Sequence, residues 1–209
     1  GRPTRQQRCS PTISAISSVP PCSDGMNSGI AFGKTTGRVS DMKIGILSDT
    51  HSYWDNRYAE HFAGCDEIWH AGDIGDYDIV RRLQAMAPVV RAVSGNIDHG
   101  TVRRLCPERI ITDVGGMRLW LGHIGGYPGK YSPGVRAELR DNGITLMVAG
   151  HSHILKVMND PTLGLLHINP GAAGPFGWQA VRTLIRLTIK DGKPSDLEVI
   201  ELAKPTPKI

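Results

Sequence analysis

From Met42 onward, short apolar and β-branched runs alternate along the chain with segments that repeat with helical periodicity. The apolar runs predict five strands, at 42–47, 67–71, 89–93, 117–121 and 145–149. Helical periodicity predicts three helices, at 56–63, 77–86 and 133–140. Such alternation is typical of α/β folds in which helices cover the faces of sheets.

Residues 1–41 follow no such pattern and are rich in Ser, Pro, Gly and Thr. We expect them to form a flexible, low-complexity tail in front of a single domain that spans residues 42–209. The segment 29–35 of this tail superficially resembles a phosphate-binding P-loop. It has three residues between its glycines where that motif needs four, and no strand precedes it, so we reject it.

The composition narrows the choice of partners. The chain has 209 residues, of which 40% are hydrophobic, and no apolar run approaches the roughly 20 residues that cross a bilayer. We therefore expect a cytoplasmic protein without a membrane partner. The net charge is +4, but residues 1–41 carry +3 of it, which leaves +1 for the domain and makes binding to long nucleic acid unlikely on electrostatic grounds. Four cysteines without a CxxC pair predict free thiols.

Metal-ligand side chains follow each of the five predicted strands. They are Asp49 and His51, then Asp73, then Asn96, then His123, and finally His151 and His153. Oxygen and imidazole donors without a thiolate suit Mn²⁺, Fe or Zn²⁺ better than a structural zinc site or a calcium cage. Seven donors are too many for one tetrahedral ion and fit two ions that share a carboxylate.

These side chains fall into five ordered blocks: Asp49-x-His51, Gly72-Asp73, Gly95-Asn96-x-Asp98, Gly122-His123 and Gly150-His151-x-His153. In this order the blocks resemble the calcineurin-like metallophosphoesterase superfamily, and most closely its small bacterial and archaeal YfcE-like phosphodiesterases. The resemblance covers essentially all of residues 42–209, including the turn Asn169-Pro170-Gly171-Ala172. It implies an α/β fold, a four-layer αββα sandwich of two mixed β-sheets flanked by helices.

The resemblance also implies two divalent metal ions, with Mn²⁺ expected first and Zn²⁺, Fe or Ni²⁺ as alternatives. One ion would be held by Asp49, His51, Asp73 and His153, and the other by Asp73, Asn96, His123 and His151. Asp73 would bridge the two ions and, with Asn96 and His123, would belong to the catalytic set. Two such ions can hold a bridging hydroxide that attacks phosphorus in line with the leaving group.

The chain departs from the family pattern at two places. Many relatives have a histidine directly after the asparagine, where it can protonate the leaving oxygen, and here that residue is Ile97. His99, two residues further on, is the candidate substitute as general acid. The glycine-rich loop 124–131 offers Tyr127, Lys130 and Tyr131 as candidate substrate contacts.

Several polar or aromatic residues near the blocks have structural interpretations. We expect Asp98 to hold the loop that carries Asn96, and His70 to be a hydrogen-bonded core residue and not a ligand. His167 reads as part of a strand. Tyr53 and Trp54 either line a substrate pocket or pack into the core.

The function expected from these features is a phosphodiesterase that hydrolyses a small phosphoester or a nucleotide-like substrate. One alternative is a phosphomonoesterase or nucleotidase of the same fold. Another is a protein-interaction scaffold, because a eukaryotic retromer subunit resembles this family and works as one. A nuclease ranks lower, since the near-neutral domain lacks the charge that contacts with many phosphates require. Self-association as a homo-oligomer is an expectation from the resemblance.

Overall fold

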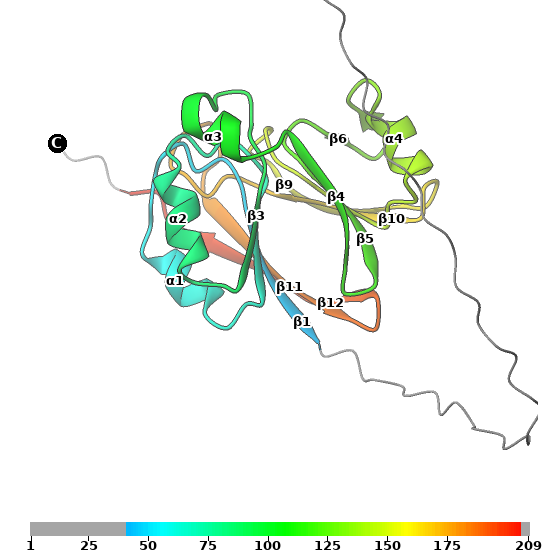
Figure 1. Ribbon diagram of the computed structural model, residues 1–209, viewed down its shortest axis with the longest axis horizontal. Helices are drawn as coiled ribbons and strands as arrows, with labels where there is room; N and C mark the ends of the chain where they lie inside the picture. The colour runs from blue at the N-terminus through cyan, green and yellow to red at the C-terminus, as the bar shows by residue number, and fades with distance from the viewer. Residues whose placement is uncertain (1–40, 206–209) are drawn as a thin grey trace, which may run out of the picture. The chain divides into compact units, whose positions relative to one another are not determined.

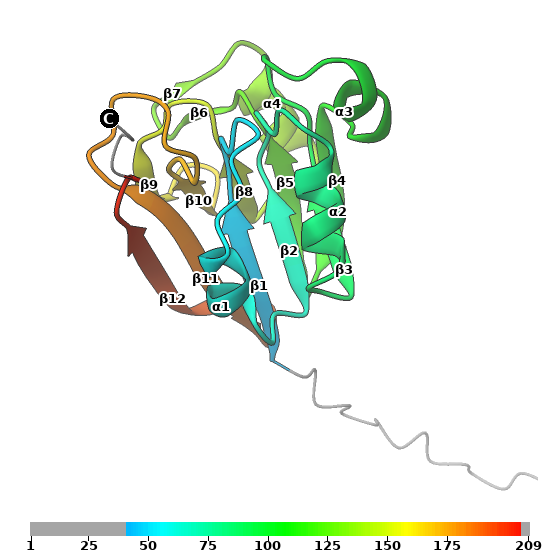
Figure 2. The ribbon, with the colours of Figure 1, turned by 90° about the vertical axis from the view of Figure 1, so that its left-hand side faces the viewer.

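The computed structural model describes residues 41–205, and Figures 1 and 2 show it from two directions. The predicted tail, apart from Asp41, and the rejected P-loop segment lie outside the described residues. Strands form two five-stranded sheets and one small hairpin.

Both large sheets are mixed. Sheet A consists, in spatial order, of β12 (Lys193–Leu202), β11 (Arg182–Lys190), β1 (Met42–Leu47), β2 (Glu67–His70) and β3 (Val89–Ala92). Sheet B consists of β4 (Arg109–Val114), β5 (Met117–Gly122), β8 (Leu146–Ala149), β10 (Leu165–Pro170) and β9 (Leu155–Asp160). The hairpin pairs β6 (Gly126–Tyr127) with β7 (Lys130–Tyr131). In sheet A, β1, β2 and β3 run parallel on one side and the antiparallel pairs lie on the other. In sheet B, parallel strands form the centre and an antiparallel pair lies at each edge.

Four helices complete the domain: α1 (Arg57–Phe62), α2 (Asp78–Gln84), α3 (Gly100–Leu105) and α4 (Val135–Asp141). The first two cover the outer face of sheet A, and α4 covers the outer face of sheet B (Figures 1 and 2). The layers therefore run helix, sheet, sheet, helix, which confirms the αββα sandwich. No helix within residues 41–205 has the length and apolar character needed to cross a membrane.

Strand β1 shows how the sequence fills this sandwich. Ile44 and Ile46 point into the core between the sheets, and Leu47 packs under the helices on the opposite face. Between them, a Cβ on Gly45 would lie 2.6 Å from a ring carbon of Phe62, so only glycine lets α1 approach this closely. Because both faces of the strand are covered, it reads as a nearly continuous apolar run.

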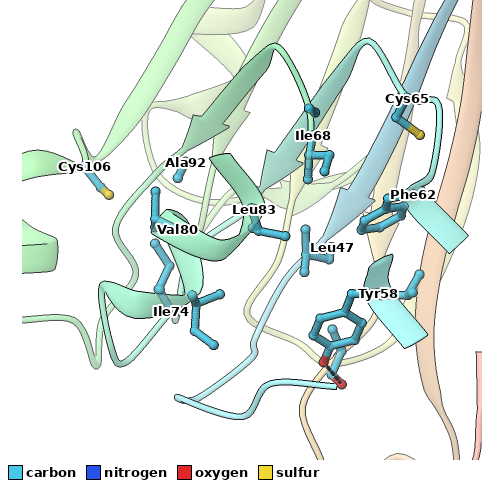
Figure 3. Packing of buried hydrophobic residues seen from close by; sticks show 14 of the residues in the cluster. Leu47, Tyr58, Phe62, Cys65, Ile68, Ile74, Val80, Leu83, Ala92 and Cys106 are labelled. Carbon is cyan, nitrogen blue, oxygen red and sulfur yellow. Dashed lines mark hydrogen bonds between the residues drawn. The ribbon is translucent and has the colours of Figure 1, made fainter. Parts of the chain in front are cut away.

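The layer beneath α1 and α2 is a separate apolar cluster (Figure 3). Leu47 and Ile68 of sheet A meet Phe62 of α1 and Leu83 of α2 there. Tyr58 is fully buried and donates a hydrogen bond to the carbonyl of Ala173 at 2.7 Å, drawn as a dashed line in Figure 3. Two of the four cysteines, Cys65 and Cys106, are buried and free, and Cys9 and Cys22 lie outside the described residues.

All eight predicted elements occur, with ends that differ from the prediction by at most two residues. The assignment of His167 to a strand is also confirmed, since it lies in β10. The apolar pattern did not predict α3 or strands β4, β6, β7, β9, β11 and β12. Strands β4 and β12 are edge strands with one exposed face, so their sequences lack a continuous apolar run. Strand β11 enters sheet A between β12 and β1, and its pairing with β1 depends on contacts that are distant in sequence.

Candidate metal centre

The seven candidate ligands come from the carboxyl ends of five strands. Strands β1, β2 and β3 are neighbours and run parallel in sheet A, and β5 and β8 are parallel neighbours in sheet B. The carboxyl ends of these strands lie at the same end of the sandwich (Figure 2). The loops that follow them therefore meet there, which is where α/β sheets usually gather functional groups.

Five of the seven ligands adopt the left-handed backbone conformation. The φ angles are 55° at Asp49, 47° at His51, 53° at Asp73, 72° at His151 and 58° at His153. This conformation is uncommon outside glycine, although Asp and His tolerate it better than most residues. It turns each chain sharply as it leaves a strand and aims the side chain across the end of the sheet.

Backbone hydrogen bonds hold these turns against one another. The amide of Asp49 donates to the carbonyl of Gly72 at 2.9 Å, and the amide of His51 donates to the carbonyl of Asp73 at 3.0 Å. In sheet B the amide of Gly150 donates to the carbonyl of His123 at 3.0 Å. The surrounding structure thus fixes conformations that would be unfavourable in isolation.

Two glycines make room for the ligands. A Cβ on Gly95 would lie 2.0 Å from Oδ1 of Asp73, and a Cβ on Gly150 would lie 2.0 Å from Oγ of Ser48 and 3.0 Å from Oδ2 of Asp49. Any other residue at either position would displace a ligand or its loop. Steric crowding therefore explains why glycine precedes Asn96 and His151.

Side chains from the two sheets meet in a first group made of Asp49, His51 and His153. Nε2 of His153 lies 3.2 Å from Oδ1 of Asp49 and 3.4 Å from Nε2 of His51. Asp49 is fully buried, and both histidines are about four-fifths covered. One ligand atom from each residue lies within 4.8 Å of the others, as the coordination of one ion requires.

A second group consists of Asp49, Asp73 and His123. Nε2 of His123 lies 3.1 Å from Oδ1 of Asp73 and 3.1 Å from Oδ1 of Asn96. The ring of His151 stands edge-on to that of His123 with centroids 5.2 Å apart. Oδ2 of Asp73 also lies 3.8 Å from Nε2 of His51, so its two oxygens face histidines of both groups.

A buried oxygen without a hydrogen-bond partner indicates that this set of donors suits a cation. Oδ1 of Asp49 is buried and accepts no hydrogen bond of good geometry among the described residues, even though Nε2 of His153 is close. An ionised oxygen without a partner in the interior is costly, and a metal ion would satisfy it. All seven donors are oxygen or imidazole nitrogen, in agreement with the metals expected from the sequence.

The titration of these groups shows the same demand for positive charge. Burial alone would raise the pKa of Asp73, but the hydrogen bond from His123 and the charge of that ring lower it below its ordinary value. Burial would lower the pKa of His123, yet the hydrogen bond to Asp73 and the charges of Asp49 and Asp73 raise it. The lowered pKa keeps the carboxylate of Asp73 ionised, and a metal ion would compete with protons for His123.

Behind the ligands, Asp98 and His70 hold the loops in place. The carboxylate of Asp98 accepts hydrogen bonds from the amides of Gly95 and Gly75, both at 2.7 Å, and of Ile74 at 3.1 Å. His70 is fully buried, lies 2.9 Å from Oγ1 of Thr50 and accepts a bond from the amide of Gly72. Burial lowers the pKa of His70 to about 4, so it is neutral, and both residues are structural as expected.

The structure places His99 apart from these groups. It is exposed at the start of α3, and its Nδ1 lies 3.0 Å from the carbonyl of Ile97. It lines an open cavity between α2 and α3 that also contains Ser52 and Ile97.

The aromatic residues after β1 pack against other side chains. Trp54 stacks edge-on against Tyr58, and the ring of Tyr53 faces the guanidinium of Arg182 at 5.1 Å. In the 124–131 loop, the hydroxyl of Tyr131 donates to Oδ2 of Asp160 at 2.6 Å. Tyr127 lines the cavity beside His151, whereas Lys130 and Tyr131 do not.

Asn169 supports the ligand loops, although the sequence indicates it only as part of the turn Asn169-Pro170-Gly171-Ala172. Nδ2 of Asn169 donates to the carbonyl of Gly150 at 2.8 Å and to Oγ of Ser152 at 3.1 Å. It therefore anchors the loop with both His151 and His153. The buried pair of Arg182 with Asp55, 2.6 Å apart, had no local signal because the partners are separated by 127 residues.

Comparison with known proteins connects this geometry to a family. The sequence profile of the calcineurin-like phosphoesterase superfamily domain matches residues 42–192. A probable metallophosphoesterase of Methanocaldococcus jannaschii is 29% identical over 170 residues, which cover 77% of this chain and 82% of that protein.

Solved structures share the fold. Vacuolar protein sorting 29 from Cryptosporidium parvum superposes with a TM-score of 0.60 at 19% identity, over 78% of this chain and 99% of that one. A predicted phosphoesterase from Streptococcus pneumoniae gives a TM-score of 0.57 at 20% identity, over 79% of this chain and 91% of that one. At these identities the likeness establishes the architecture of the domain.

Proposed function

The chain belongs to the calcineurin-like phosphoesterase superfamily, and from that premise we propose that it is a binuclear-metal phosphodiesterase for small or nucleotide-like esters. Metal-dependent phosphoester hydrolysis is the activity that its family and its candidate ligand groups support. The observation that supports the finer proposal is that two adjoining groups of candidate ligands, Asp49 with His51 and His153 and Asp49 with Asp73 and His123, share the buried carboxylate of Asp49, whose Oδ1 has no hydrogen-bond partner among the described residues.

In this proposal the ligands divide as the family resemblance implies. Asp49, His51 and His153 serve one ion, and Asn96, His123 and His151 serve the other. Asp73 serves both, which agrees with its two oxygens facing His51 and His123. When bound, two divalent ions would lower the pKa of a water molecule and polarise the phosphoryl oxygens for in-line attack.

The chain's own residues orient the reacting groups. The left-handed turns and the three amide bonds to Asp98 keep the ligand loops rigid, so little reorganisation is needed during the reaction. Ile97 occupies the position from which relatives donate a proton to the leaving oxygen. We assign that proton transfer to His99, the next imidazole along the chain, which is exposed and whose Nδ1 lies 3.0 Å from the carbonyl of Ile97.

Elemental analysis combined with a hydrolysis panel tests the proposal. The purified protein should contain about two divalent ions per chain, with Mn²⁺ expected first. It should hydrolyse phosphodiesters faster than phosphomonoesters, and a chelator should abolish the activity until Mn²⁺, Zn²⁺, Fe²⁺ or Ni²⁺ is restored. A preference for monoesters would replace the diester assignment with a phosphomonoesterase or nucleotidase.

A binding module is the second candidate, and one observation favours it. Three large apolar side chains beside the site are exposed, namely Ile154, Phe176 and the fully exposed Trp178. Exposed apolar groups of this size mark surfaces that contact a partner. Protein that holds its metals fully but hydrolyses no member of the panel would favour this function over catalysis.

A further inference from the structure

A cavity of about 210 Å³ adjoins the candidate metal centre on the side of sheet B. His151 and Ser152 form its border with the centre, and Tyr127, Lys156 and His167 line the remainder. No carboxylate lines this cavity among the residues that the structure describes. The cavity therefore combines one cation and several hydrogen-bonding groups with aromatic and aliphatic side chains, the latter from Ile124 and Ile154.

Lys156 of β9 supplies the positive charge. Its Nζ lies 3.6 Å from the centroid of the Tyr127 ring, a cation–π contact that restrains the long side chain. Within residues 41–205 no carboxylate lies within 4 Å of that Nζ. Since an ammonium has three donors and the ring face engages only part of it, hydrogen-bonding capacity remains for a ligand.

Ser152 supplies a second donor. Its Oγ accepts a hydrogen bond from Nδ2 of Asn169 at 3.1 Å and another from the amide of Ile154 at 3.3 Å. With both lone pairs used, the hydroxyl proton has no acceptor among the described residues. An anion in this cavity would receive bonds from both Ser152 and Lys156.

In a neighbouring cavity, by contrast, the positive side chains are paired with carboxylates. About 200 Å³ in volume, it borders Asn96 and His123 on the other side of the centre and is lined by two arginines. Arg103 is paired with Glu108, and Arg109 is paired with Glu138. Its positive charges already have partners, whereas the charge of Lys156 does not.

We propose that the Lys156 cavity is an anion subsite, which recognises a carboxylate or phosphate on the part of the substrate that flanks the scissile phosphoester. The inference rests on the proposed function, because the subsite selects among substrates of the same centre. It narrows the substrate class to phosphoesters that carry a second anionic group. Lys156 is a specificity residue in this assignment, with no part in the chemical step.

A matched pair of substrates tests the subsite. 4-Nitrophenyl phenyl phosphate and its analogue with a carboxylate on the phenyl ring differ by one anionic group. The protein should prefer the carboxylated ester about tenfold in kcat/KM, as one charge-assisted hydrogen bond provides. Lys156→Met should remove this preference while changing kcat/KM for the plain ester less than about twofold, and Lys156→Arg should retain it.

Lys130→Met is the control, because it removes the same charge from the nearby hairpin at a residue that does not line the cavity. It should keep the preference. An equal loss in both variants would reduce the effect to net charge and overturn the subsite, as would a wild-type protein without any preference.

A second readout does not depend on activity. Calorimetric titration of the protein as purified with 4-carboxybenzylphosphonate and with benzylphosphonate should show tighter binding of the carboxylated probe. The difference should disappear in Lys156→Met and persist in Lys130→Met. If neither diester is hydrolysed but this difference is present, the proposed function fails and the subsite stands. Equal binding of both probes would remove the subsite whatever the activity.

Discussion

Strand β1 and the loop that follows it belong to two regions with opposite construction. Between the sheets, Ile44 and Ile46 are fully buried among apolar side chains from both sheets. A few residues later, Asp49 and His51 sit in left-handed backbone with polar atoms crowded together, one of them without a hydrogen-bond partner. The comparison teaches that stability and chemistry come from successive parts of the same strand. Each region can therefore be damaged without the other.

The largest expected effect comes from Asp73→Asn in the metal centre. The substitution removes the charge that faces both histidine groups, so activity should fall by on the order of 10⁴-fold and bound metal should drop sharply. The fold should persist, as judged by circular dichroism. Asp191→Asn is a matched control, since Asp191 has a similar φ of 50° in the β11–β12 turn. An active, metal-loaded Asp73→Asn protein would contradict the bridging role.

The reverse effect is expected in the core between the sheets. Ile46→Ala should lower the free energy of unfolding by about 3 kcal/mol, because it leaves a cavity at a fully buried position. Metal content per folded molecule should not change. Urea unfolding measures the loss, and Ile154→Ala, at an exposed isoleucine, should cost less than about 0.5 kcal/mol. Loss of metal at full stability would show that the two regions are coupled.

Asp98 connects the core to the ligand loops, so Asp98→Asn should have an intermediate effect. The amide cannot accept three backbone hydrogen bonds as strongly as the carboxylate, so the loops after β2 and β3 should loosen. Metal affinity should fall by about 10- to 100-fold, the usual cost of losing a residue that orients ligands. Competition with a chelating dye measures the change. Asp141→Asn, at an exposed residue of α4, should leave the affinity unaltered.

His167 should make the free energy of unfolding depend on pH. Burial lowers the pKa of this residue to about 4 from an ordinary value of 6.5, with a smaller contribution from Lys156. Its Nε2 is 3.1 Å from the carbonyl of Gly126, and its Nδ1 has no partner among the described residues. Because the unfolded chain binds the proton more tightly, stability should fall as the pH decreases from about 6.5 toward 4.

The contribution of His167 between pH 7.5 and pH 5 should be about 2 kcal/mol. Urea unfolding at the two pH values measures it. His167→Gln keeps a donor for the carbonyl of Gly126 but has no titrating group. Between pH 7.5 and pH 5, the variant should therefore lose about 2 kcal/mol less of its free energy of unfolding than the wild-type protein loses. The same pH dependence in both proteins would assign the effect to other residues, such as His70.

The smallest effect is expected at the outer rim of the site. His99→Ala should slow the hydrolysis of alkyl phosphodiesters about tenfold, because an alkoxide leaves poorly without a proton. Nitrophenyl esters should be almost unaffected, since nitrophenolate needs no general acid. Comparison of kcat for the two ester classes measures the difference. Equal rates of loss would remove His99 from the proton transfer.

The central strands, and the candidate ligands that follow them, could be predicted from the sequence for a physical reason. Strands covered on both faces read as largely apolar runs, and the candidate ligand blocks follow the five predicted runs that end at 47, 71, 93, 121 and 149. The family pattern of five ordered blocks then specified the sandwich. The sequence profile and the layers of the structure bear out both the family and the architecture.

Features that depend on distant contacts were not readable. Lys156 appears as one more polar residue in an edge strand, and only folding sets it against Tyr127 and beside His151. Lys130, which was singled out from its glycine-rich loop, does not line that cavity. Local sequence reports the conformation of a segment, whereas the face on which a side chain lies depends on the pairing of β9 with β10.

The pairing of β1 with β11 has a consequence for how the protein is made. Met42 pairs with Ile189, so β1 finds one of its two neighbours only after β11 has been synthesised. Contacts this distant in sequence slow folding. Sheet A should therefore be completed only after β11 has left the ribosome, and the nascent domain should expose an unpaired β1 edge that chaperones can recognise.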